Sequence, residues 1–264
     1  MGVDWVPAAV RDGADPRELA SLAAEHARLV RLLGLTSRPR PAGTDEDAAA
    51  RRFRDVDRRL RELLLVDGRP FRVMVVGRNP RFPPEWRDAA WTTLPPREAG
   101  EAYGRWRGWY EDVRAGRVRH YLRRLRAWDM ARDLAEAQRE LADAAHATEG
   151  RANAWARKPR FLRAREDVLA LPPVPSVPPP GPAPASAEED RPQPGQDERW
   201  EAVVHHAELL GAAQRAFNRS VPSGLRRGWP PWDGDTGAED PWLEDFFDWM
   251  GAVVRTGRGL YLWA

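Results

Sequence analysis

The amino-acid sequence predicts a helix-dominated α+β fold, with five to seven helices around a small sheet of two or three strands. Apolar residues recur at helical spacing over most of the chain. Only the short runs at residues 3–7, 71–77 and 259–264 have the apolar character of strands. The stretch 172–196 is dominated by proline and small or acidic residues, which disfavours regular structure and predicts a proline-rich disordered loop.

The first half of the chain is expected to alternate between helix and strand. A helix is predicted to begin after Asp15, because Asp15 has the character of an N-cap and Pro16 occupies the first helical position. A second helix is predicted over about 45–65. The segment FRVMVVG, 71–77, is the strongest strand candidate, since it is apolar and β-branched and ends at Gly77.

The remaining helices follow from amphipathic patterns, and they are predicted over residues 97–114, 116–149, 160–170, 197–217 and 240–254. The final strand, 259–264, is expected to pair with 71–77, and the opening run 3–7 is a further candidate partner for it in the same small sheet. We expect three parts: an α+β main part over 1–171, a proline-rich loop or linker over 172–196, and two helices with a strand over 197–264. The last part is too small for a good core of its own, so we expect it to pack on the first as one domain.

Composition excludes several kinds of protein. The chain has no cysteine, which rules out disulfides, thiolate nucleophiles and cysteine-ligated metals. No window reaches the roughly 18 apolar residues of a membrane span, and the N-terminus lacks the pattern of a secretory signal, so a cytoplasmic location without membrane contact is expected. Arginine replaces lysine almost everywhere, which indicates a high-GC bacterial gene. The formal net charge is nevertheless only +2.

The 13 tryptophans and the single lysine are the features most out of the ordinary. Tryptophan supplies buried area for a core, but a cluster of them can also line a pocket. We single out Trp109, Asn153, Trp155 and Lys158 as pocket candidates. Lys158 stands between Arg157 and Arg160, and a lysine among like charges is a candidate for a reactive amine if those charges lie close to it. The alternative is an ordinary residue at a helix end, held extended by the following Pro159.

Two helical faces carry histidine with carboxylates, the side chains that bind zinc, manganese or iron. Glu201, His205 and Glu208 follow one face, and Asp143 with His146 follow another. Both patterns arise readily by chance in acidic helices, so exposed polar faces are the competing interpretation. The run 233–244 resembles a calcium-binding loop in its acids, but it lacks the central glycine and contains a proline, which favours a turn before a helix.

Arginines raise the question of anion or nucleic-acid binding. Arg78 and Arg81 follow the predicted strand 71–77, but neither glycine-rich nucleotide fingerprint is present. Arg119, Arg123 and Arg126 share a helix face and could contact phosphates. Acidic residues follow them in the same helix and can neutralise their charge through ion pairs within the helix.

The sequence therefore favours a non-enzymatic protein that binds a partner protein or a small ligand, both of unknown identity, and no cofactor is expected. A metal-assisted or acid–base enzyme that uses the histidine and carboxylate faces is the alternative. An arginine-rich nucleic-acid binder is the third possibility.

Overall fold

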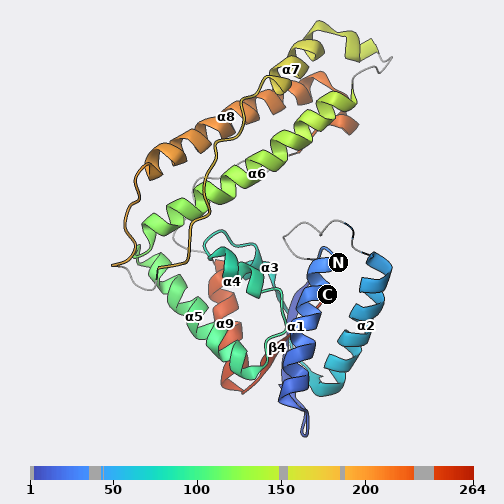
Figure 1. Cartoon of the computed structure of the whole chain (residues 1–264), viewed down its shortest axis with the longest axis vertical. Coiled ribbons are helices and arrows are strands. Elements are labelled where there is room, and N and C mark those ends of the chain that lie inside the picture. Colours follow the sequence, from blue (N-terminus) through green and yellow to red (C-terminus); the bar gives the residue numbers. More distant parts are fainter. Residues whose placement is uncertain (1–2, 36–42, 44, 149–153, 185–187, 229–240) are drawn as a thin grey trace. The chain divides into compact units, whose positions relative to one another are not determined.

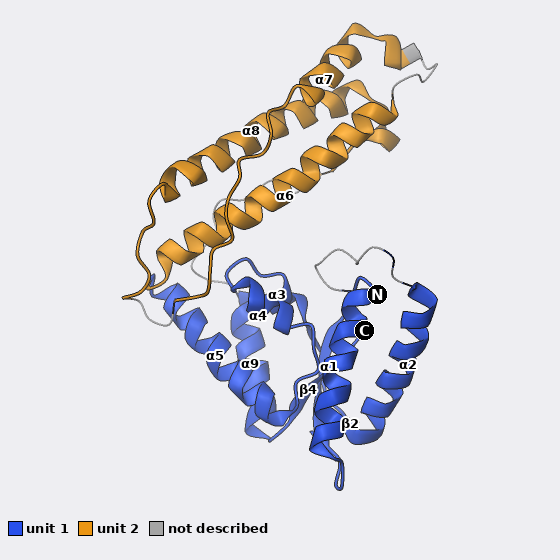
Figure 2. Cartoon of the chain, in the orientation of Figure 1, with its two compact units in different colours: residues 1–116, 237–264 blue, residues 117–236 orange. Residues whose placement is uncertain are grey.

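The computed structural model describes residues 3–35, 43, 45–148, 154–184, 188–228 and 241–264. The chain forms two compact units (Figure 2). Unit 1 contains Met1–Gly116 and Gly237–Ala264, and unit 2 contains Arg117–Thr236. The division therefore falls before the long sixth helix and before the last helix, and both ends of the chain belong to unit 1.

Unit 1 is built on a small antiparallel sheet whose central strand is β1 (Asp4–Val10). On one side β1 pairs with β4 (Gly259–Trp263), so that Trp5 lies opposite Leu262 and Val6 opposite Tyr261. On its other side β1 pairs with β2 (Leu64–Val66) and β3 (Phe71–Arg72). The described residues thus hold four strands, one more than expected, and the helix-dominated α+β class is confirmed.

A bulge between β2 and β3 accommodates a proline in the central strand. The Asp67 amide donates to the Pro7 carbonyl at 3.0 Å, and Gly68 adopts a φ of +123°. Since the amide nitrogen and carbonyl of one strand residue face the same neighbour, the missing N–H of Pro7 faces this bulge. A bulge is one of the few places where a sheet tolerates proline.

Two helices, α1 (Pro16–Leu32) and α2 (Glu46–Leu63), cover one face of the sheet (Figure 1). Both begin as their sequences predict. Asp15 accepts the amide of Arg17, and Asp45 accepts the amide of Ala48, each at 2.9 Å. The buried residues of this layer form one cluster that includes Ala8, Leu19, Leu29, Val56, Leu60 and Tyr261.

The opposite face is covered by α5 (Pro96–Arg114) and α9 (Pro241–Arg255), with the short helices α3 (Met74–Gly77) and α4 (Pro84–Ala89) beside them (Figure 1). Here aromatic rings make the core. Trp5 of β1 stacks on Trp106 of α5 and on Phe246 of α9, at centroid distances of 5.6 and 5.7 Å.

The expected strand over 71–77 is wrong beyond its first two residues. Only Phe71 and Arg72 are in a strand, and the rest forms the single helical turn α3. A short apolar run fits either structure, and tertiary packing decides between them. Gly77 lies so close to the Trp91 ring that a Cβ atom there would be 2.6 Å from Nε1. The final strand accordingly pairs with β1 and not with 71–77.

Unit 2 is a helical bundle of α6 (Arg119–Ala147), α7 (Pro159–Leu169) and α8 (Gln196–Ser220). Two short 3-10 turns, η1 (Ala154–Arg157) and η2 (Ser223–Leu225), flank the bundle helices. Its core includes Leu134, Leu141, Phe161, Leu210 and Phe217. Across both units, none of the described helices combines the length and the apolar character needed to cross a membrane.

The proline-rich stretch has no helix or strand among its described residues before residue 196, as its composition predicts. It differs from the expected disordered loop because it is tied to the bundle. Val174 and Val177 pack against the core of unit 2, and Gln138 donates to the Pro172 carbonyl at 3.0 Å. Asp190 lies buried at the start of α6, where its carboxylate accepts the amides of His120 and Tyr121 at 2.8 and 2.6 Å.

Candidate functional site

A buried polar network joins β4 to both helices of the α1–α2 layer. The Tyr261 hydroxyl donates to Asp57 Oδ1, and Arg61 Nε donates to the same hydroxyl at 3.0 Å. A second guanidinium nitrogen of Arg61 lies 3.0 Å from Asp57 Oδ2. His26 Nε2 lies 3.6 Å from Asp57 Oδ1. Three side chains, one each from α1, α2 and β4, therefore meet around one carboxylate.

The helical spacing of α1 and α2 places these residues. Asp57 and Arg61 are four apart on α2, so both face the same direction. His26 lies on the buried face of α1 with its ring 4.8 Å from that of Phe53, and it is fully buried. His206 on α8 is buried too and pairs with Gln138 at 2.8 Å. Both histidines are thus core residues, as their positions on apolar faces suggest.

The network fixes the protonation of its members. Burial raises the pKa of Asp57, but the nearby His26 ring, the hydrogen bond from Tyr261 and the charge of Arg61 together outweigh burial and hold that pKa below its usual range. Burial, reinforced by the hydrogen bond to Asp57, raises the pKa of Tyr261 well above the usual range of a phenol. At neutral pH Asp57 is therefore ionised and Tyr261 keeps its proton.

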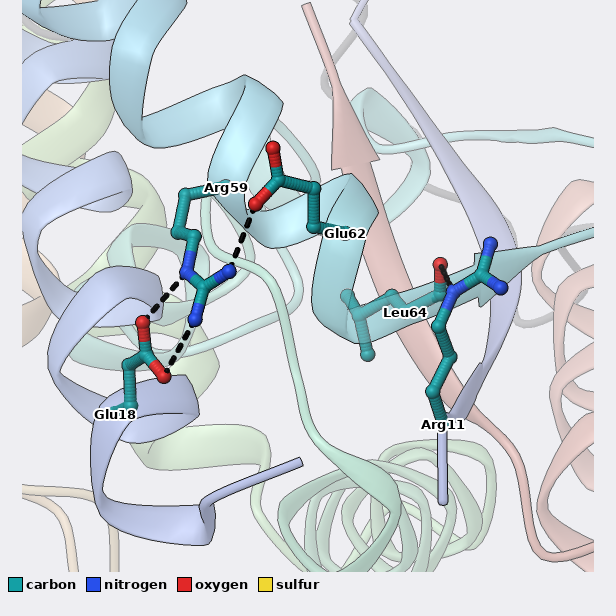
Figure 3. Close-up of polar contacts among 5 residues, drawn as sticks. All are labelled: Arg11, Glu18, Arg59, Glu62 and Leu64. Carbon is teal, nitrogen blue, oxygen red and sulfur yellow. Dashed lines mark hydrogen bonds and ion pairs between the residues drawn. The ribbon is translucent and has the colours of Figure 1, made fainter. Parts of the chain in front are cut away.

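An open depression of about 590 Å³ borders this network and is lined by Arg11, Asp57, Arg58, Arg61 and Glu62. Arg11 extends from the end of β1, and its Nε donates to the Leu64 carbonyl at 3.3 Å. Figure 3 shows the two terminal nitrogens of Arg11 pointing away from Leu64. Among the described residues these nitrogens have no partner.

The acids of the depression are neutralised by other partners. Glu62 accepts a hydrogen bond from Arg59 at 2.7 Å, while Arg59 also holds Glu18 with two hydrogen bonds (Figure 3). Asp57 is engaged by Arg61 and Tyr261. Of the three guanidinium groups in the lining, Arg61 is paired with Asp57 and Arg58 with Asp55, so Arg11 supplies the positive charge that no described acid neutralises.

The pocket candidates from the sequence occupy other places. Trp109 is 5% exposed in the core of unit 1, where its Nε1 donates to the Arg81 carbonyl at 2.8 Å. Trp155, in unit 2, packs edge-on against Phe161 at 5.1 Å. Lys158 is exposed and stands in the N-cap position of α7 with an extended backbone, which Pro159 favours. Asn153 lies outside the described residues.

The metal candidates are exposed on the bundle helices. His205 Nδ1 lies 4.0 Å from Glu208 Oε2 on α8, and both side chains are more than two-thirds exposed. Glu201 is exposed on the same helix, and Asp143 and His146 are exposed on α6. Within the described ranges no three histidine or carboxylate side chains gather as metal ligands would. Most of the calcium-like run, residues 233–240, is outside those ranges.

The arginines that were predicted to contact an anion or a nucleic acid interact with other groups of the protein or are buried. Arg123 forms an ion pair with Asp197 at 2.9 Å, and Arg119 Nε lies 3.3 Å from the His120 ring. Arg78 lies over the Trp91 ring. Arg81 is 7% exposed, and Arg126 is half-buried. Neither group of arginines is therefore fully exposed within its own unit.

Sequence reasoning missed the network and the depression. Asp57 and Tyr261 are 204 residues apart, so no local motif links them. The i, i+4 spacing of Asp57 and Arg61 was a visible signal, but many such pairs occur on an arginine-rich helix. Comparison with known proteins adds no assignment: no family model, no curated protein and no solved structure matches this chain.

Proposed function

We propose that this chain is a non-enzymatic small-ligand-binding protein, and that the depression beside Asp57 binds a compact ligand with an acidic group. One observation carries the proposal. Arg11 and Arg61 face the same depression, and each is held by acceptors of the chain itself.

The two arginines are ordered before any ligand arrives. Arg61 is fixed by Asp57 and Tyr261, and its guanidinium also lies over the rings of Tyr261 and Trp263, at 5.6 and 5.7 Å. Arg11 is fixed through Nε and keeps its terminal N–H groups for another acceptor. Ordering a free arginine costs up to about 2 kcal/mol of side-chain entropy, so a ligand that meets ordered arginines avoids part of that cost.

The chemistry of the depression suits a carboxylate or a phosphate. A guanidinium group offers planar, paired donors that match two oxygens of either group. The depression has the volume of a small-molecule site, although it is open to solvent. We therefore expect a compact ligand bound by charge and hydrogen bonds more than by enclosure.

The protonation of the network favours binding over acid–base catalysis. An effective general acid or base has a pKa near the working pH. The pKa of Asp57 is lowered and that of Tyr261 is raised, so both groups move away from neutrality. The network is suited to holding Arg61 in place and not to exchanging protons with a substrate.

Isothermal titration calorimetry at low ionic strength tests the proposal, with citrate and inorganic phosphate as probes and glycerol as a neutral control. We expect one of the anions to bind and glycerol not to bind. Arg11→Gln should weaken that binding about tenfold, the loss of one charge-assisted contact. Arg51→Gln is the matched control, because Arg51 is exposed on α2 and is not in the lining.

The proposal is overturned by either of two results. One is that neither anion binds the wild-type protein. The other is that Arg11→Gln binds as tightly as Arg51→Gln.

A further inference from the structure

Unit 2 has a cationic depression of its own, between α7 and α8, with a volume of about 360 Å³. Arg160 and Arg163 reach it from α7, and Arg219 reaches it from α8. The sequence analysis did not select any of these three arginines as a binding residue. Arg160 and Arg219 are 59 positions apart in the chain, and the packing of α7 against α8 brings them to the same depression.

The depression exists because small side chains lie where α7 and α8 meet. Ala164 is buried and Ala216 is half-buried, and both line the depression. Arg160 and Arg163 are three residues apart, so they lie side by side on one helix face. The result is a recess with an apolar floor and guanidinium groups around it.

The three arginines keep their charge available. Among the described residues none of them has an ion-pair or hydrogen-bond partner for its side chain, and all three are exposed. Asp167 also lines the depression, but it forms no ion pair with Arg163, which is one helical turn away. On α6 the situation is different, since Arg123 is paired with Asp197.

The start of α7 adds to this positive potential. Pro159 occupies the first helical position and lines the depression, which extends from this N-terminal end along α7 as far as Asp167 and is also lined by the last turns of α8. That end carries the positive pole of the helix dipole. Arg157 and Lys158 precede it, and no acid occurs between residues 156 and 165.

We infer that this depression binds the phosphate group of a phosphorylated ligand. Three guanidinium groups can surround a tetrahedral anion with paired N–H donors, and arginine matches phosphate geometry better than lysine does. Phosphate alone is much smaller than the recess, which leaves room for the next part of the ligand. The inference is separate from the proposed function, because it concerns another unit and other residues.

Two sources can supply this chemistry, a free phosphorylated small molecule or a strand of nucleic acid. Pyrophosphate and a single-stranded oligothymidylate are the probes, and binding is measured by calorimetry at low and moderate salt. All proteins carry Arg11→Gln, so that binding in the depression of unit 1 is weakened and is the same in every protein compared. Arg163→Gln with Arg219→Gln is the test variant. Arg215→Gln is the matched control, because Arg215 is exposed one turn before Arg219 and is outside the lining.

We expect pyrophosphate to bind the parent and the Arg215→Gln protein equally, and the double variant to bind at least about tenfold more weakly. Ala216→Gln fills the recess without a change of charge and should weaken binding as well. A free phosphorylated ligand is indicated if only pyrophosphate shows this pattern. A nucleic-acid strand is indicated if the oligonucleotide shows it too, with an affinity that falls steeply as salt rises.

Circular dichroism confirms that each variant keeps its helices. The inference is overturned if neither probe binds, or if the double variant binds as well as the Arg215→Gln control. It is also overturned if the double variant weakens binding but Ala216→Gln does not, because the site is then a diffuse basic surface and not this recess.

Discussion

Tyr261→Phe removes a single oxygen from the centre of the buried network. The ring stays, so the packing of β4 against α1 and α2 should be preserved. What is lost is the hydrogen bond from the hydroxyl to Asp57 and the acceptor for Arg61 Nε. The effect on stability therefore reports the network and little else.

The magnitude follows from the burial of the two partners. Tyr261 is 1% exposed and the Asp57 side chain 17%, so water cannot easily replace the donor to the carboxylate. A hydrogen bond to a charged group contributes about 1.5–3 kcal/mol. Arg61 is half-exposed and can turn to water, so its lost acceptor should add little. We expect a loss of about 2 kcal/mol in the free energy of unfolding.

Urea unfolding followed by tryptophan fluorescence measures this loss, because Trp5 and Trp106 lie in the core of the same unit. With an m-value of about 2 kcal/mol per molar, the midpoint should fall by about 1 M. Asp57→Asn should be at least as damaging, since it removes the charge that Arg61 and Tyr261 share. Asp55→Asn is the matched control, because Asp55 is an exposed residue of the same helix.

The two substitutions should also be coupled. Tyr261→Phe removes the hydrogen bond that Asp57→Asn weakens, because an amide oxygen is a weaker acceptor than a carboxylate, so the double variant should be less damaged than the sum of the two single variants. The reasoning is refuted if Tyr261→Phe shifts the midpoint no more than Asp55→Asn does, or if the two effects simply add.

Three other outcomes are expected. Because the pKa of Asp57 is lowered in the folded state, its stabilising effect is complete above the ordinary carboxylate value of about 4 and is lost as pH falls through the lowered pKa. Wild-type stability should therefore fall more steeply than that of Asp57→Asn between about pH 5 and 3, and parallel curves would contradict this. Asp190→Ala removes the cap of α6 and should cost unit 2 about 1 kcal/mol, with faster hydrogen exchange at the His120 and Tyr121 amides; unchanged exchange there would count against the capping role. Gly259→Ala would place a Cβ against the Leu94 carbonyl, so we expect a loss above about 2 kcal/mol in thermal unfolding, whereas an unchanged Tm would show that the strand can move aside.

Local signals in the sequence are enough for the longer helices and for two of the strands, but not for the short helices α3 and α4. Asp15 caps the helix that it was expected to cap, the second helix forms where its pattern predicts one, and the terminal run that contains Tyr261 forms a strand. These elements follow from patterns within a few residues, which a sequence displays directly. The buried aromatic core around Trp106 also follows from helical spacing.

The strand pairing and the candidate site depend on contacts that the sequence does not display. The run 71–77 has the composition of a strand, but the close approach of Gly77 to Trp91 accompanies a helical turn. Arg11 becomes part of a site only because β1 ends beside α2. Neither the approach of Gly77 to Trp91 nor the position of Arg11 beside α2 can be derived from residue types or local spacing.

The most direct test of the proposed site observes the arginine side chains themselves. Nuclear magnetic resonance resolves arginine Nε–H signals, and the signal of Arg11 can be assigned by its disappearance in Arg11→Gln. On titration with citrate or phosphate, the signals of Arg11 and Arg61 should shift together and saturate, while that of Arg51 should not move. Uniform small shifts of all arginine signals, with no saturation, would show only general screening by salt and would contradict a binding site in the depression beside Asp57.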